Sequence, residues 1–205
     1  MSLNWRGSER VADFLRSMAR PPWRLLKRTI HRLLYPVRHR MARRLAKRVG
    51  TPQSLLFVCL GNICRSPYAA QAIVRELPSS WSNLMRVDSA GFIGPNRTSP
   101  PYAAEVASER GVDLSDHRSK LLNPRMIDST DLIVVMEPWQ RRAVMRLSNR
   151  RGTPVLVLGD LRPTAGDHRS VVDPFDGKRE LFERSYDDVD TCLDQLVRIM
   201  TDSQF

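Results

Sequence analysis

The sequence contains few cysteines: Cys59, Cys64 and Cys192 are the only three in 205 residues. A small secreted domain held together by disulfides normally carries a denser and even-numbered set. The low, odd count excludes that class of protein. It suits a reducing compartment, in which thiols are either buried or reactive, and we therefore expect a cytoplasmic protein.

Long apolar runs are also absent. No stretch approaches the ~18–20 consecutive apolar residues that a membrane-spanning helix needs. Arginines interrupt every short apolar run near the N-terminus, so the sequence does not predict a cleaved secretory signal either.

Acidic residues are scarce in one part of the chain only. Residues 1–50 contain 14 Lys and Arg against 2 Asp and Glu, whereas the remainder contains 19 against 20. The net charge of +11 thus belongs to the N-terminal part, and the body is nearly neutral. This partition predicts a basic extension over 1–50 and a domain over 53–203, and we do not expect nucleic acid to be the main partner.

The body alternates between short apolar runs and stretches with helical periodicity. Strands are expected at 54–60, 85–92, 131–137 and 154–160, and helices at 66–77, 99–111, 138–148 and 180–200. Strands that alternate with helices are typical of a parallel sheet covered on both faces. The sequence therefore predicts an α/β fold, a doubly wound sheet of about four parallel strands with flanking helices, preceded by a basic helical extension.

The stretch "CLGNICRS", Cys59 to Ser66, follows the first expected strand. Ligands of doubly wound sheets bind at the carboxyl ends of strands, where the strand order reverses. A loop that leads into a helix N-terminus attracts anions through its backbone N–H groups and the helix dipole. Gly61 supplies backbone freedom, Ser66 is a possible N-cap, and Arg65 offers a bidentate fork for phosphate oxygens. We expect a phosphate-binding loop.

Cys59 begins this loop and is the candidate nucleophile. A helix N-terminus and an adjacent cation lower a cysteine pKa from about 8.5 to roughly 3.5–7.5, so the thiolate dominates. The alternative is that Cys59 and Cys64 are small buried apolar residues. A metal site is a weaker alternative, because neither has His or Cys partners at ligand spacing. The Cys-x5-Arg-Ser spacing and the strand–loop–helix setting favour chemistry.

"VCLGNICRSP" resembles the signature of the low-molecular-weight protein tyrosine phosphatase family. The elements "VDSAG", "GVDLSDHRSKLL", "DLIVVME" and "VVDPFDG" follow in the order of that family, so the resemblance spans Ser54 to Met200. It implies hydrolysis of protein phosphotyrosine, without a cofactor or a metal ion.

The resemblance implies a role for each matching residue. Cys59 would attack phosphorus and form a phosphocysteine, and Arg65 would hold the equatorial oxygens. Ser66 would donate a hydrogen bond to the Cys59 thiolate. Asp173 would protonate the leaving oxygen and then activate water.

Further roles follow from the same resemblance. Asn62, supported by Ser89 and His117, would hold the loop conformation, and Cys64 would form a reversible disulfide with Cys59. The residues expected to contact substrate are Leu60, Gly61, Asn62, Ile63, Cys64, Ser66 and Phe175.

The expected reaction also needs a general acid, the role assigned to Asp173. Expulsion of an alkoxide or phenoxide is unfavourable at neutral pH, and a positioned acid contributes about 10²–10⁴-fold. Asp160, Asp167 and Asp176 are rival carboxylates on the same loop-rich segment, where most aspartates only form turns. The Asp-Pro of "VVDPF" matches the family position and is therefore preferred.

Substrate choice depends on the rim of the loop. Phe175 and Phe92 are candidate aromatic walls for a phenyl ring, although Asp176 stands where some family members carry a second aromatic. Protein arginine phosphatases of this fold share "DPF" but have threonine at the position of Ile63, so Ile63 favours phosphotyrosine. Arsenate reduction fits poorly, because Cys192 is the only further thiol. Arginine phosphatase activity and a non-catalytic phosphate-binding scaffold stay open as alternatives.

Residues 22–49 have the pattern of a basic amphipathic helix with a bend at Pro36. Its apolar positions are Trp23, Leu26, Ile30, Leu33, Val37, Met41 and Leu45. Such a helix can lie on an anionic membrane, with roughly 1 kcal/mol per basic residue near the surface. That interpretation predicts peripheral association with the inner face of a membrane. An acidic partner, nucleic acid, an organellar presequence and packing on the domain are the alternatives.

Overall fold

The computed structural model describes residues 22–82, 84–150 and 152–202. Residues 1–21 of the expected extension and the last residue of the expected domain lie outside this range. The elements, in chain order, are α2 (Pro22–Val49), β1 (Ser54–Cys59), α3 (Arg65–Glu76), α4 (Ser79–Ser82), β2 (Arg86–Gly91), α5 (Pro101–Glu109), α6 (Pro124–Asp128), β3 (Leu132–Val135), α7 (Pro138–Leu147), β4 (Val155–Val157), the 3₁₀ helix η1 (Leu158–Leu161) and α8 (Arg179–Thr201).

The four strands form one parallel sheet in the order β2-β1-β3-β4. This confirms the predicted fold class. The chain adds β2 on one side of β1 and β3 on the other, so the strand order reverses at β1. The carboxyl end of β1 is therefore the place where a doubly wound sheet opens a crevice for a ligand.

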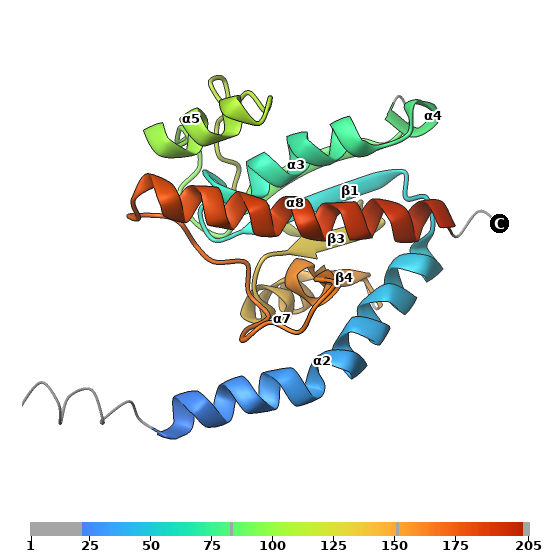
Figure 1. Cartoon of the computed structure of the whole chain (residues 1–205). Coiled ribbons are helices and arrows are strands. Elements are labelled where there is room, and N and C mark those ends of the chain that lie inside the picture. Colours follow the sequence, from blue (N-terminus) through green and yellow to red (C-terminus); the bar gives the residue numbers. More distant parts are fainter. Residues whose placement is uncertain (1–21, 83, 151, 203–205) are drawn as a thin grey trace, which may run out of the picture.

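Both faces of the sheet are covered, because successive side chains of a strand point to opposite sides. Leu55 and Phe57 of β1 pack into one buried cluster with residues of α3, α5 and α8. Leu56 and Val58 pack into a second cluster with α7. Figure 1 shows α3, α5 and α8 on one side of the strands and α7 on the other. All six residues of β1 are buried, as its continuous apolar pattern predicts.

Two boundaries differ from the sequence prediction. Helix α3 begins at Arg65 with Cys64 as its N-cap, so the prediction of Ser66 as N-cap is wrong. The fourth strand ends at Val157, where the chain turns into η1 instead of continuing to residue 160. A β-carbon at Gly159 would lie 2.1 Å from the Arg169 carbonyl oxygen, so the chain there passes too close for any other residue.

The C-terminal half of helix α2 buries apolar side chains against the body. Ala42 and Ala46 are buried in the main core, with Leu45 and Val49 packed against it, and the helix contacts α8, η1 and β4. Figure 1 shows that α2 changes direction partway along its length. Pro36 lies inside the helix, and a proline removes one backbone hydrogen bond and bends the helix there.

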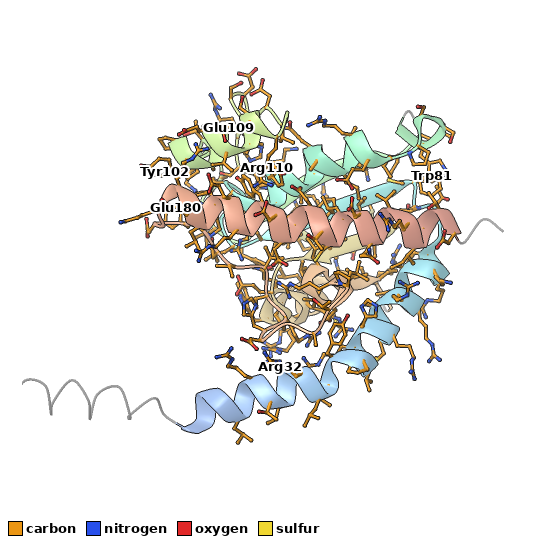
Figure 2. All side chains as sticks on the ribbon, viewed as in Figure 1. Arg32, Trp81, Tyr102, Glu109, Arg110 and Glu180 are labelled. Atoms are coloured by element: carbon orange, nitrogen blue, oxygen red, sulfur yellow. The ribbon has the colours of Figure 1, made fainter. Side chains whose placement is uncertain are left out.

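One side of α2 exposes apolar residues from Leu26 to Met41. The α2 stripe consists of Leu26, Ile30, Leu33, Leu34, Val37 and Met41, each between 42% and 72% exposed. The side chain of Trp23 lies outside the described part. On the other side of the helix, Arg28 and Arg32 pair with Asp167 of the body, and Figure 2 shows Arg32 on the side of α2 that faces the body. Within the described residues, none of the helices is both long and apolar enough to span a bilayer.

Candidate active site

The Cys59–Ser66 loop joins the buried end of β1 to the first turn of α3. The Cys59 side chain is buried, and its Sγ lies 3.0 Å from Ser66 Oγ. The backbone N–H of Asn62 donates to the same sulfur at 3.2 Å. The sulfur therefore lies beside the N-terminus of α3, with one backbone N–H directed at it and a hydroxyl within hydrogen-bond distance.

Asn62 holds the loop together from its centre. It is fully buried and adopts a left-handed conformation with φ 51°. Besides its contact with Cys59, its Nδ2 donates to Ser89 Oγ at 2.8 Å and to Ser66 Oγ at 2.9 Å. Its Oδ1 accepts from the backbone N–H of Lys120 at 2.7 Å. The tight curve therefore depends on Asn62, whereas the sequence analysis assigned it to Gly61, which has no positive φ.

These contacts fix the orientation of the Asn62 side-chain amide. A backbone N–H can only donate, so the Asn62 oxygen faces Lys120 and its NH₂ group faces the two serines. Ser66 Oγ accepts from that NH₂, and its proton faces either Cys59 Sγ at 3.0 Å or the Ala90 carbonyl oxygen at 3.4 Å. When the Ser66 hydroxyl donates to Cys59 Sγ, it stabilises a negative charge on the sulfur.

His117 contacts the same loop from behind. Its Nε2 lies 2.7 Å from the Asn62 carbonyl oxygen, and because a carbonyl only accepts, Nε2 carries the proton. Burial lowers the pKa of His117, with the positive charge of Lys120 as a smaller cause. The ring is therefore neutral near pH 7 and holds the loop without adding charge.

Gly91 is a site-forming residue that the sequence analysis did not single out, although it lies in the quoted "VDSAG". A β-carbon at this position would come within 2.8 Å of the backbone of both Leu60 and Asn62. The end of β2 thus lies directly against the Cys59–Ser66 loop. Only glycine allows this approach.

Arg65 is almost fully buried, with its side chain 1% exposed. Its Nη1 donates to Glu137 Oε1 at 3.1 Å and to the Val171 carbonyl at 3.0 Å. Its Nη2 forms an ion pair with Asp173. Its Nε is buried and has no partner within the described residues, so one donor of the guanidinium is available to an anion.

Glu137 is the second residue that the sequence analysis missed as a site residue, although "DLIVVME" contains it. It follows β3 and accepts hydrogen bonds from Trp139 Nε1 at 3.0 Å and from Gln140 Nε2 at 3.1 Å, in addition to Arg65. A carboxylate held by three donors fixes the guanidinium in one orientation. Its position at the end of a neighbouring parallel strand was the available signal.

The structure separates Asp173 from its rivals. Asp160 pairs with Arg169, Asp167 pairs with α2, and Asp176 occupies an exposed turn with φ 61°. Asp173 alone of the four lies beside the Cys59–Ser66 loop, through its ion pair with Arg65. Asp173 Oδ1 also accepts from the backbone N–H of Phe175 at 3.2 Å.

A pocket of about 90 Å³ opens over the loop. It is lined by Cys59, Leu60, Gly61, Ile63, Cys64, Arg65, Ile93, Arg97, Asp173 and Phe175. Asn62, Ser66, Ser89 and His117 lie behind this surface and support it. Ile93 and Arg97 are new members of the rim. Phe92 does not line the pocket, because its ring packs on Trp139 at 5.2 Å.

Arg97 connects the rim to the loop. Its Nη2 donates to the Gly61 carbonyl at 2.9 Å and to the Ile93 carbonyl at 3.1 Å, and its Nε donates to Gly94 at 3.0 Å. The sequence offered no signal for this residue, because its reach back to the loop depends on the fold.

The three cysteines are free thiols in this structure, and all are buried. Burial raises the pKa of Cys64, and the neighbouring Cys59 raises it further. Burial likewise raises the pKa of Cys192, which lies in the core as predicted. Cys64 and Cys192 are therefore protonated near neutral pH. In the described residues no three His, Cys, Asp or Glu side chains form a cluster that fits a metal ion.

Comparison with known proteins agrees with this geometry. A model of the family described as low molecular weight phosphotyrosine protein phosphatase matches residues 54–204. A protein-arginine-phosphatase of Bacillus subtilis is 30% identical over 145 residues, which cover 70% of this chain and 94% of that protein. A probable low molecular weight protein-tyrosine-phosphatase, EpsP, of Ralstonia nicotianae is 32% identical over 139 residues, which cover 66% and 92% of the two chains.

Solved structures show the same relationship. Wzb of Vibrio vulnificus in complex with benzylphosphonate superposes with a TM-score of 0.62 at 27% identity, covering 72% of this chain and 98% of that one. The YwlE arginine phosphatase of Geobacillus stearothermophilus gives 0.64 at 28% identity, covering 75% and 96%. With its phosphate-binding loop, its buried cysteine and this match, the chain belongs to the low molecular weight phosphotyrosine protein phosphatase family, whose members are cysteine-dependent phosphatases.

Proposed function

We propose that this chain hydrolyses phosphotyrosine in proteins through a phosphocysteine intermediate on Cys59. The observation that carries the proposal is the convergence of Cys59, Arg65 and Asp173 on one pocket. They come from the end of β1, the start of α3 and the loop before α8. A nucleophile, an anion clamp and a proton donor thus meet where a strand-to-helix loop already attracts an anion.

Anion binding comes first. The N-terminal turn of α3 directs backbone N–H groups toward the loop, and Arg65 adds a buried positive charge fixed by Glu137. Its unpartnered Nε is a donor for a phosphoryl oxygen. A phosphoryl group bound there has its phosphorus in front of Cys59 Sγ.

In the first step, the Cys59 thiolate attacks phosphorus. An S–P bond forms while the bond from phosphorus to the tyrosine oxygen breaks. With the phosphoryl group in the place of Asp173 beside Arg65, Asp173 in its acid form gives its proton to that oxygen, so that tyrosine leaves as a neutral phenol. Asp173 is exposed at the mouth of the pocket, where a leaving group would lie.

In the second step, water attacks the phosphocysteine. The Asp173 carboxylate accepts a proton from this water while the S–P bond breaks, and inorganic phosphate leaves. The electron pair returns to sulfur, where the hydroxyl of Ser66 and the N–H of Asn62 stabilise the thiolate. The enzyme ends in its starting state.

The rim supports an aromatic substrate. Phe175 is half exposed, and Ile93 lies in the same rim. Together they give an apolar wall for a phenyl ring. Ile63 also lines the pocket. Protein arginine phosphatases of this fold have threonine at the matching position, so Ile63 favours phosphotyrosine as the substrate. The similarity to named arginine phosphatases keeps phosphoarginine as the second candidate substrate.

A substrate panel tests the proposal. Purified protein and its Cys59→Ser variant are compared on a phosphotyrosine peptide, a phosphoarginine peptide and arsenate, with a chelator present. We expect hydrolysis of phosphotyrosine that disappears in the variant. Persistent hydrolysis in the variant would refute the mechanism. A higher kcat/KM on the phosphoarginine peptide than on the phosphotyrosine peptide would show that the substrate assignment is wrong.

A phosphate-binding scaffold without turnover is the alternative from another class. It has no need of Asp173 at the pocket, nor of a nucleophile activated by Ser66. Release of inorganic phosphate in multiple turnovers excludes the scaffold, whereas tight phosphopeptide binding without release would establish it.

We further propose that α2 lies on the surface of an anionic membrane, as a peripheral contact of a cytoplasmic enzyme at the inner face. The observation behind this is the exposed α2 stripe on a helix with no acidic residue in its first turn and with Lys47 and Arg48 in its last. Amphipathic helices of this kind bury their apolar face in the headgroup region. Nucleic acid does not require an apolar face of this kind, so it is the weaker partner.

Co-sedimentation tests the membrane contact. The full chain is mixed at low salt with phosphatidylcholine vesicles that contain or lack phosphatidylglycerol. We expect binding to the anionic vesicles only. No binding to either kind would refute the contact.

A further inference from the structure

A basic groove lies between α2 and β4, one of the two edge strands of the sheet, away from the Cys59–Ser66 loop. This α2–β4 groove has a volume of about 650 Å³, which lies within the usual range of small-molecule sites, about 300–1,000 Å³. Its lining residues are Arg38, Met41, Ala42, Arg44, Leu45, Arg48, Arg141, Val155, Leu156, Val157, Asp160 and Arg169.

The charges of the groove are strongly unbalanced. Five arginines face a single carboxylate, Asp160. That carboxylate is already taken by Arg169, whose Nε donates to Oδ1 at 2.8 Å and whose Nη2 donates to Oδ2 at 2.5 Å. Among the described residues, Arg141 donates only to the backbone carbonyl of Val155, at 3.2 Å. The protein thus neutralises one of the five charges.

Arg44 and Arg48 have no partner of their own among the described residues. Both are exposed, and within the described part of the chain neither makes a hydrogen bond or an ion pair. They stand one helical turn apart, so their guanidinium groups reach the same region. Two planar forks at that spacing match the oxygens of a phosphate group.

Arg38 lies close enough to other positive charges of the groove to be repelled by them. Partial burial and the charge of Arg169 lower the pKa of Arg38, while Asp160 raises it less. Its Nη1 contacts His31 Nδ1 at 3.0 Å, another group without negative charge. An anion in the groove would relieve this repulsion.

The α2 stripe leads directly into these arginines. At spacings of three and four residues, one row along the helix reads Leu26, Ile30, Leu33, Val37, Met41, Arg44 and Arg48. Met41 belongs both to the stripe and to the lining of the groove. Val155 and Val157 continue the apolar character along the opposite wall. A ligand that fits the whole row is apolar at one end and anionic at the other.

We propose that the α2–β4 groove binds the phosphate headgroup of an anionic glycerophospholipid whose acyl chains lie along the α2 stripe. This inference rests on the proposed membrane contact of α2 and names the lipid site within it. It does not depend on the catalytic mechanism. An acidic peptide or a nucleic acid would use the arginines and leave the stripe in water.

The test compares two double variants that remove the same charge from the same helix. Arg44→Gln/Arg48→Gln removes the unpartnered arginines of the groove. Arg40→Gln/Lys47→Gln removes two exposed charges of α2 that do not line it. Binding of the full chain to phosphatidylcholine vesicles with and without phosphatidylglycerol is measured at one salt concentration, and thermal unfolding checks that both variants fold.

We expect the groove variant to bind the anionic vesicles roughly tenfold more weakly than the charge-matched control, because it loses charge-assisted hydrogen bonds as well as charge. An equal loss of vesicle binding in the two variants would show a general electrostatic attraction and would refute the groove as the lipid site. Absence of wild-type binding would remove the membrane contact and this inference together, whereas equal loss leaves the contact intact.

A second arm distinguishes the source of the phosphate. Calorimetry with dihexanoyl phosphatidylglycerol, which is water-soluble, is expected to show binding to wild type that the groove variant loses. Glycerophosphoglycerol, the same lipid without its acyl chains, is expected to bind more weakly, because it leaves the α2 stripe uncovered. Glycerophosphoglycerol or polyglutamate binding as tightly as the short-chain lipid would overturn the lipid assignment.

Discussion

The Cys59–Ser66 loop and helix α2 differ in how far the protein itself satisfies their polar and apolar groups. In the loop, Asn62 is fully buried and all its polar groups have partners: Cys59, Ser66, Ser89, His117 and the Lys120 backbone. In the described part of α2, six apolar side chains are exposed, and Arg44 and Arg48 make no hydrogen bond or ion pair with a described residue.

The loop is stabilised by contacts within the protein, whereas the exposed surface of α2 can be stabilised only by contact with a binding partner. A loop that satisfies its own hydrogen bonds holds its shape before a substrate arrives, which is what electrostatic preorganisation requires. A helix with unsatisfied apolar and cationic surface gains free energy only when something else covers it. Changes in the loop should therefore alter both catalysis and stability, whereas changes on the stripe should alter binding alone.

The largest expected effect comes from the acid. Asp173→Asn keeps the shape of the side chain but removes the transferable proton, so kcat on a phosphotyrosine peptide should fall by about 10²–10⁴-fold. Steady-state kinetics measure this, with Asp176→Asn on the same loop as the control. If the control variant loses as much activity as Asp173→Asn, the assignment of the acid is wrong.

The support of the loop should be visible in stability. Asn62→Ala deletes three side-chain hydrogen bonds and leaves a buried alanine with positive φ, so we expect a loss of about 2–3 kcal/mol in the free energy of unfolding. Asn96→Ala is the matched control, because Asn96 has φ 62° but is exposed. Urea denaturation of both variants separates backbone strain from lost hydrogen bonds. Equal destabilisation would mean that the network around Asn62 contributes nothing.

The opposite result is expected on the stripe. Leu33→Gln should leave the free energy of unfolding within about 0.5 kcal/mol of wild type, because Leu33 is 72% exposed. Binding to phosphatidylglycerol-containing vesicles should weaken roughly tenfold, since a leucine side chain no longer enters the interface. Leu84→Gln, at an exposed leucine outside α2, is the control for both measurements. A large loss of stability in Leu33→Gln would contradict the expectation that the α2 stripe contributes to binding and not to folding.

The smallest effect concerns Glu76 on α3, a half-buried carboxyl group outside both regions. Burial raises its pKa to about 7, with Asp194 and Asp190 of α8 as further causes, and its Oε2 has no partner within the described residues. Between about pH 4.5 and pH 7 the folded state holds a proton that the unfolded state has released. Stability should therefore fall as the pH rises through this window.

Glu76→Gln removes that dependence. Because Glu76 is only half buried, solvent screening limits the gain over wild type above pH 7 to about 1 kcal/mol, and the gain should vanish below about pH 4.5. Unfolding at several pH values measures it. A difference between variant and wild type that is the same at every pH would contradict this account of Glu76.

The sequence was sufficient where local pattern and local structure coincide. The continuous apolar run of β1 and the alternation of strands with helices predicted the parallel sheet, and "CLGNICRS" predicted the loop at its carboxyl end. Cys59, Arg65 and Asp173 were chosen from residue chemistry and family resemblance, and the fold brings them to one pocket.

What the sequence could not supply depends on contacts distant along the chain. Glu137 contacts Arg65 because β3 lies beside β1, and Arg97 reaches Gly61 only once the chain after β2 folds back. Ser66 has the residue type of an N-cap, but its hydroxyl faces Cys59 and the helix starts earlier. The helical pattern of α2 was visible, whereas which half of the helix buries apolar side chains against the body was not.

The most direct test of the central claim is to trap the covalent intermediate. The Asp173→Asn variant is mixed with p-nitrophenyl phosphate, whose leaving group needs little acid assistance, and quenched rapidly, and the phosphorylated residue is mapped by mass spectrometry. Slow hydrolysis without Asp173 should let phosphocysteine accumulate on Cys59, and Cys59→Ser should give none. Release of phosphate without any phosphorylated Cys59, or phosphate on another residue, would contradict the mechanism.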